Sequence, residues 1–204
     1  MTKSIEELLV EQNTSAEETT NLDTETKEET QLAENPAAEP PVSEAQVIEN
    51  YTSANVIELL KKSLNIHWQQ TTSLSAQAIH LDRWGYKKLA SAIKADAEEE
   101  HEHSMINLAR LEFFDEDYQP LVVAPKTWAR HDILAMIKYN LASVQEAAVA
   151  ERATIVAARA VGDEMTANIM IPLLQGSENG IILYEGYLKL IEQMGLDNFL
   201  SINV

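Results

Sequence analysis

Apolar residues recur along most of the chain at alternating steps of three and four, the spacing of one face of an α-helix. Four stretches carry this pattern: Ser53 to Leu81, Leu89 to Leu111, Leu134 to Ala158, and Asp163 to Met194. Glycine separates the first two at Gly85 and the last two at Gly162, and residues 114–131 form a long connection. With a short helix over residues 197–202, the pattern predicts an all-α fold, a four-helix bundle with one long crossover.

Polar side chains interrupt the apolar face near the middle of the first two helices. Five of them occupy positions where the pattern requires apolar residues: His67, Asp96, Glu100, His103 and Asn107. Burial of an ionisable group is costly unless the group is paired or binds a cation. These positions therefore predict a polar site inside the bundle.

The first hairpin brings two of these histidines to the same height. His67 and His103 each lie 18 residues from Gly85, and Glu100 precedes His103 by about one turn on the same face. Two imidazoles and a carboxylate are a ligand set for divalent iron, manganese or zinc. We predict a metal site at these residues. The alternative is a metal-free cluster in which Glu100 hydrogen-bonds the histidines.

The second hairpin offers no ligand at the matching distance from its turn. Val144 and Gly180 each lie 18 residues from Gly162, and neither side chain can bind a metal. Glu151 faces inward, but this measure puts it about two turns from the predicted layer. The predicted ligands therefore all come from the first hairpin.

Charge separates an acidic extension from the helical part of the chain. Residues 1–50 are rich in Glu, Thr, Ala and Pro, which predicts a disordered extension before a bundle domain over residues 51–204. The formal net charge of -18 disfavours nucleic acid and anionic membranes as partners. No apolar run approaches the roughly 20 residues of a membrane span, and the chain has no cysteine. We expect a soluble, cytoplasmic protein.

Three segments resemble bacterioferritin, a haem-containing iron-storage family of the ferritin-like superfamily. They are Trp84–Leu89, the pair Glu100-x-x-His103, and Leu190–Leu200, and the resemblance extends from about Val56 to the C-terminus. It implies a ferritin-like bundle that assembles into a hollow 24-mer. It also implies oxidation of Fe(II) at a di-iron site inside each bundle and storage of ferric mineral in the cavity.

The resemblance carries over only part of the di-iron site. The first-helix Glu of the family falls on His67, and its first Glu-x-x-His is retained as Glu100 and His103. The remaining family ligands fall on residues of other chemistry: Val144, Ser177 and Gly180. One iron position is thus retained with an altered ligand, whereas the other lacks its terminal ligands.

The resemblance also concerns haem. In bacterioferritin the haem lies between two subunits and takes a methionine from each, at the position that holds His101 here. Histidine is also an axial haem ligand, so His101 is a candidate ligand for haem b. The alternative is a solvated or dimer-interface histidine.

Three functions stay open at this point. The first is a bacterioferritin-like subunit of a homo-oligomeric cage that stores or handles non-haem iron at the reduced site. The second is an accessory subunit in a hetero-oligomer with a complete ferritin paralogue. The third is a scaffold or adaptor protein that acts through its acidic tail. Whether the chain oxidises Fe(II) depends on the second metal position, which lacks ligands.

Overall fold

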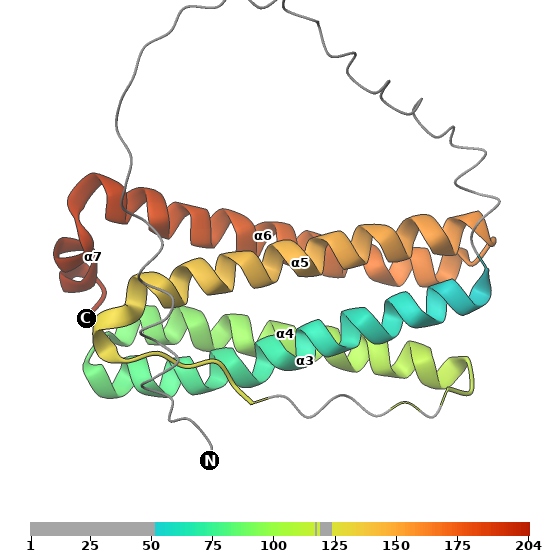
Figure 1. The fold of residues 1–204 in the computed structure, drawn as a ribbon, viewed down its shortest axis with the longest axis horizontal. Helices are drawn as coiled ribbons and strands as arrows, with labels where there is room; N and C mark the ends of the chain where they lie inside the picture. The colour runs from blue at the N-terminus through green and yellow to red at the C-terminus, as the bar shows by residue number, and fades with distance from the viewer. Residues whose placement is uncertain (1–51, 117, 119–123) are drawn as a thin grey trace, which may run out of the picture. The chain divides into compact units, whose positions relative to one another are not determined.

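The computed structural model describes residues 52–116, 118 and 124–204 (Figure 1). Its helices in chain order are α3 (Ser53–Trp84), α4 (Lys87–Phe113), the short 3₁₀ helix η1 (Arg130–Asp132), α5 (Ile133–Ala160), α6 (Glu164–Met194) and α7 (Leu196–Ile202). The predicted acidic extension over residues 1–50 lies outside the described residues. Within those ranges, no helix is long and apolar enough to cross a membrane.

The long helices form two antiparallel hairpins, α3 with α4 and α5 with α6 (Figure 1). Gly85 follows α3 with a φ of 94°, and Gly162 follows α5 with a φ of 76°. Glycine is favoured at both turns because a β-carbon makes this left-handed conformation costly. The second hairpin continues at Asp163, whose carboxylate accepts from the backbone N–H of Thr166 and caps α6.

The connection between α4 and α5 runs back along α3. Asn65 donates from Nδ2 to the hydroxyl of Tyr118 at 2.5 Å. Farther along both segments, the backbone N–H of Lys126 donates to Oγ of Ser73 at 2.9 Å. The described parts of the connection thus follow α3 toward its C-terminal end, where α5 begins (Figure 1). This confirms the predicted one-crossover topology.

The short helix α7 covers the end of the bundle that holds the α3–α4 turn. The backbone N–H of Lys88, at the start of α4, donates to the carbonyl of Asn203 at 3.1 Å. Phe199 is buried and packs against Tyr187, with ring centroids 5.5 Å apart. The predicted short C-terminal helix is therefore confirmed.

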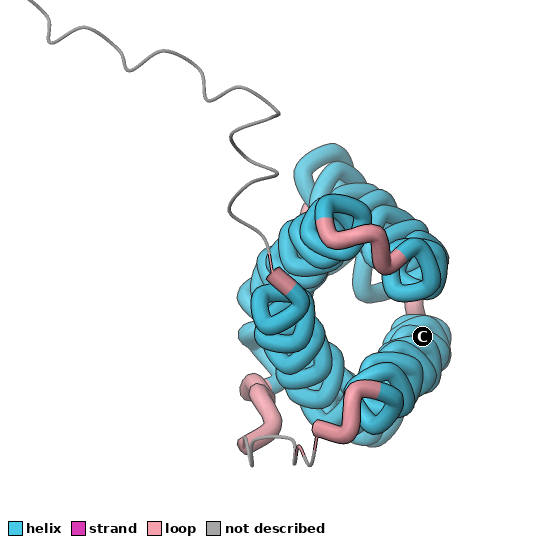
Figure 2. Tube along the Cα trace, turned by 90° about the vertical axis from the view of Figure 1, so that its right-hand side faces the viewer, coloured by secondary structure: helices cyan, strands magenta, loops and turns pink. Residues whose placement is uncertain are grey.

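The buried apolar side chains form two clusters, one toward each end of the bundle. The cluster near the α3–α4 turn includes Leu81, Leu89 and Ile137. The cluster toward the α5–α6 turn includes Leu60, Leu111 and Leu173. Between them lie buried polar side chains from all four long helices, among them His67, Glu100, Glu151 and Ser177. Viewed from its end, the bundle has these helices around a common interior (Figure 2).

Helical periodicity alone does not decide which residues of α6 are buried in its C-terminal half. Leu190 is 38% exposed, whereas the adjacent Ile191 is 9% exposed. Tyr184 is fully buried in place of Leu183, which is half-buried. Helical spacing from Gly180 allows either Leu183 or Tyr184 to face inward, and packing selects the tyrosine.

Candidate metal centre

His67 and His103 face each other across the first hairpin, as their equal distances from Gly85 predict. Their ring centroids lie 5.1 Å apart in an edge-to-face arrangement. His67 is fully buried and His103 is 7% exposed. Helical periodicity and the Gly85 turn together therefore place both imidazoles in the interior.

Glu100 lies between the two histidines. Its Oε2 is 2.5 Å from Nδ1 of His67 and 3.8 Å from Nδ1 of His103. One ligand atom from each of the three side chains lies within 4.8 Å of the other two. Because a divalent ion binds nitrogen and oxygen at about 2.0–2.2 Å, small side-chain movements would let all three bind one ion.

Burial and proximity set the protonation of the His67–Glu100 pair. Burial alone lowers the pKa of His67, but Glu100 and Glu151 outweigh this effect and raise that pKa to about 9. Burial alone raises the pKa of Glu100, but His103 and His67 outweigh it and lower that pKa to about 2. At neutral pH the metal-free pair is therefore an imidazolium hydrogen-bonded to a carboxylate. A cation that takes Nδ1 must displace its proton.

Glu151 of α5 joins this cluster, so its predicted separation of two turns was wrong. Its Oε1 lies 3.1 Å from Nε2 of His67, and its side chain is fully buried. The prediction assumed that residues equally far from Gly85 in the first hairpin and from Gly162 in the second lie at the same height in the bundle. Glu151 lies only 11 residues before Gly162, yet it contacts His67, which lies 18 residues before Gly85.

The helix α6 is shifted along the bundle in the same direction as α5. A β-carbon built on Gly176, 14 residues after Gly162, would lie 2.6 Å from Cε1 of His103. A β-carbon on Gly180 would instead lie 3.3 Å from Cγ1 of Val144. Val144 and Gly180 thus face each other as predicted, but α6 meets His103 one turn earlier. The second hairpin is therefore shifted along the bundle by one to two turns relative to the first.

Several buried polar atoms in this region have no hydrogen-bond partner in the described part of the chain. They are Nε2 of His67, Nδ1 of His103, both carboxyl oxygens of Glu151, and the side-chain oxygens Oγ of Ser63, Oδ1 of Asn107 and Oγ of Ser177. The contact between His67 Nε2 and Glu151 has the distance of a hydrogen bond but not its alignment. Each unpaired buried group costs about 1–3 kcal/mol. A buried set of imidazole nitrogens and carboxyl oxygens without partners fits a bound divalent ion such as iron.

Comparison with known proteins places this bundle in a family. A model of the ferritin-like domain matches residues 57–194, about two thirds of the chain. The chain belongs to the ferritin family. The match covers the helices α3 to α6 that carry the buried polar cluster. No curated protein sequence matches the chain.

Family membership suggests iron storage or handling as the general role of this ferritin-family chain. The three side chains predicted as ligands converge in its interior. The sequence places Glu151 on the inward face of its helix but does not place it beside these ligands. It is an acidic residue on an otherwise apolar helical face, as Glu100 is on α4.

Asp96 and Asn107, the other polar residues predicted on the inward face of α4, make hydrogen bonds outside the metal-ligand cluster of this ferritin-family bundle. The hydroxyl of Tyr184 on α6 donates to the Asp96 carboxylate. Burial raises the pKa of Asp96 to about 6, against the opposing effect of that hydrogen bond. Asn107 donates from Nδ2 to the backbone carbonyl of His103 at 3.0 Å. Neither residue belongs to the group of converging ligand atoms.

His101 lies apart from the interior cluster, on the outer side of α4. It is exposed, and its ring centroid is 6.3 Å from that of Trp68 on α3. It lines an open groove of about 950 Å³ between α3 and α4. Haem binding at His101 stays a prediction.

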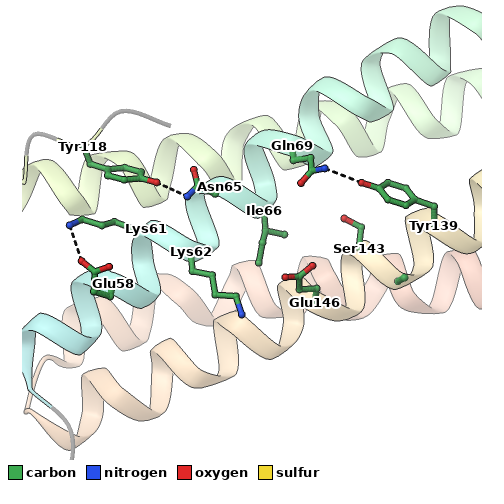
Figure 3. Close-up of a pocket in the computed structure, with 11 residues that line it drawn as sticks. Glu58, Lys61, Lys62, Asn65, Ile66, Gln69, Tyr118, Tyr139, Ser143 and Glu146 are labelled. Carbon is green, nitrogen blue, oxygen red and sulfur yellow. Dashed lines mark hydrogen bonds and ion pairs between the residues drawn. The ribbon is translucent and has the colours of Figure 1, made fainter. Parts of the chain in front are cut away.

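A second surface groove, of about 540 Å³, lies on the other side of α3, toward α5 (Figure 3). Gln69 donates to the hydroxyl of Tyr139 at 3.2 Å across this groove. At one end, Lys61 pairs with Glu58 at 3.0 Å. The groove contains none of the predicted ligands, so it is separate from the candidate metal centre.

Proposed function

We propose that this ferritin-family chain binds one iron ion in its interior, through His67, Glu100 and His103, and acts as an iron-handling subunit of a multimeric cage. The observation that carries the proposal is the convergence of three buried ligand atoms within 4.8 Å of one another. Iron here is the cargo of the protein. The two imidazoles and the carboxylate supply a mixed nitrogen and oxygen ligand set suited to Fe(II).

The Val144–Gly180 contact supports one ion per chain. These residues occupy positions where the bacterioferritin pattern has ligands, and a β-carbon on Gly180 would already lie 3.3 Å from the Val144 methyl group. This contact lies one to two turns from the candidate centre, and at the centre itself α6 presents Gly176, which has no ligating side chain either. A two-iron reaction would therefore need ligands from residues outside that pattern.

The same contact supports a second candidate, an accessory subunit that co-assembles with a ferritin paralogue carrying a complete di-iron site. Such a subunit contributes shell and iron binding but little oxidation. Sedimentation of the chain alone, and after refolding with a complete ferritin, separates the homomeric cage from the mixed one. A cage of bacterioferritin size, up to 24 subunits, is expected of the first candidate.

Anaerobic Fe(II) titration of the full chain, followed by exposure to oxygen, tests the iron site. We expect saturation near one Fe(II) per chain, loss of that binding in Glu100→Ala, and unchanged binding in Glu102→Ala. Glu102 is the matched control because it lies on the same helix and is exposed. Rapid oxidation by the homomer supports the first candidate, and oxidation at the rate of buffer supports the second. Equal binding by Glu100→Ala and the wild type would refute the site.

A further inference from the structure

His67 is held between two carboxyl groups that come from different helices. Its Nδ1 lies 2.5 Å from Oε2 of Glu100 on α4, and its Nε2 lies 3.1 Å from Oε1 of Glu151 on α5. Glu100 Oε2 is also 3.8 Å from His103. The Nδ1 side of the ring therefore faces the proposed ligand cluster, and the Nε2 side faces Glu151.

A neutral imidazole binds a metal through one nitrogen and carries its proton on the other. In metal sites that N–H group usually donates to a carboxyl or carbonyl oxygen, which fixes the tautomer and the orientation of the ring. Glu151 is the carboxyl group that lies next to Nε2. The arrangement matches the carboxylate–histidine–metal triads of known sites.

We propose that Glu151 is a positioning residue: it accepts a hydrogen bond from Nε2–H of His67 and so directs the Nδ1 lone pair at the iron position shared with Glu100 and His103. This inference rests on the proposed function. A small rotation of either side chain would convert the present unaligned contact of 3.1 Å into a hydrogen bond.

The contact with His67 is the one polar interaction of Glu151 in the described part of the chain. Its side chain is fully buried, and neither carboxyl oxygen has a hydrogen-bond donor within the described ranges. A carboxyl group buried in this way destabilises a fold compared with an apolar residue of similar size. A hydrogen bond to a metal-binding imidazole would offset the loss of stability that comes from burying this carboxyl group.

Two substitutions separate the positioning role from the alternatives. Glu151→Met keeps the volume and removes the acceptor, whereas Glu151→Gln keeps an acceptor oxygen and removes the charge. Co(II), which reports its ligands through visible absorption bands, is the probe for the full-length protein. Urea unfolding of each metal-free variant gives its stability.

We expect Glu151→Met to be at least as stable as the wild type without metal, yet to bind Co(II) about 10- to 100-fold more weakly. Glu151→Gln should recover most of the affinity with an unchanged Co(II) spectrum. Wild-type affinity and spectrum in Glu151→Met would overturn the positioning role alone.

If Glu151→Gln loses as much affinity as Glu151→Met and its Co(II) bands shift, Glu151 binds the metal directly, and the positioning role is again refuted. If Glu100→Ala binds Co(II) as tightly as the wild type, the proposed function and this inference are both overturned.

Discussion

Gly176 on α6 lies directly against the imidazole of His103 on α4. A β-carbon at Gly176 would be 2.6 Å from Cε1 and 3.1 Å from Nε2 of that ring, and 2.6 Å from Oε1 of Glu99. The Glu99 side chain is half exposed and can move away, whereas the His103 ring is held in the interior. Packing of α6 therefore controls the position of one proposed ligand.

Gly176→Ala should displace His103, with a cost of about 1–3 kcal/mol in the free energy of unfolding from overpacking and weaker Co(II) binding. Gly186→Ala is the matched control, because Gly186 lies in the same helix and a β-carbon there would meet no atom within 4 Å. It should raise stability by up to about 1 kcal/mol through helix propensity. Urea unfolding and Co(II) titration check both; unchanged Co(II) affinity in Gly176→Ala would contradict the coupling.

Bound metal should stabilise the fold, because the site forms only in the native bundle. At a free concentration one hundred times the dissociation constant, a ligand specific to the native state adds about 2.7 kcal/mol. Thermal unfolding with increasing Co(II) should therefore shift to higher temperature in the wild type and in Glu102→Ala. Glu100→Ala should show no such shift, and a full shift in that variant would place the metal elsewhere.

Asp96 makes stability depend on pH in the weakly acidic range. Its pKa is raised from 3.8 to about 6, chiefly by burial. The folded state thus holds this proton more tightly than the unfolded chain, so the contribution of Asp96 is full below pH 3.8 and is lost as pH rises through about 6. Asp96→Asn keeps an acceptor for Tyr184 without the charge, and its stability relative to wild type should rise between about pH 4 and 7. Urea midpoints across that range measure the difference, and a constant difference would contradict the raised pKa.

Asp163 ties the start of α6 to α4. Its carboxylate caps the N–H of Thr166 at 3.0 Å and pairs with Arg110 at 2.7 Å. Asp163→Ala should cost about 1–2 kcal/mol, mostly from the lost cap. Asp163→Asn should retain most of that stability because its amide oxygen still caps the helix. Equal losses in urea unfolding would instead assign the effect to the ion pair with Arg110.

The first hairpin could be predicted closely from the sequence. The helical period fixed the inward face of His67, and the Gly85 turn fixed its height relative to His103, so their contact followed from local geometry. The same reasoning paired Val144 with Gly180. It does not decide which residues of α6 are buried after Gly180, because packing against the neighbouring helices selects between Leu183 and Tyr184.

The sequence by itself thus determined the helices, the turn within each hairpin and the two histidines and glutamate that converge at the candidate metal centre. Only the tertiary structure decided how far the second hairpin is shifted along the first, and with it that Glu151 meets His67 and Gly176 meets His103. The physical reason is that periodicity and turns act within a hairpin, whereas the relative height of two hairpins is set by side-chain packing of α3 on α5 and α4 on α6.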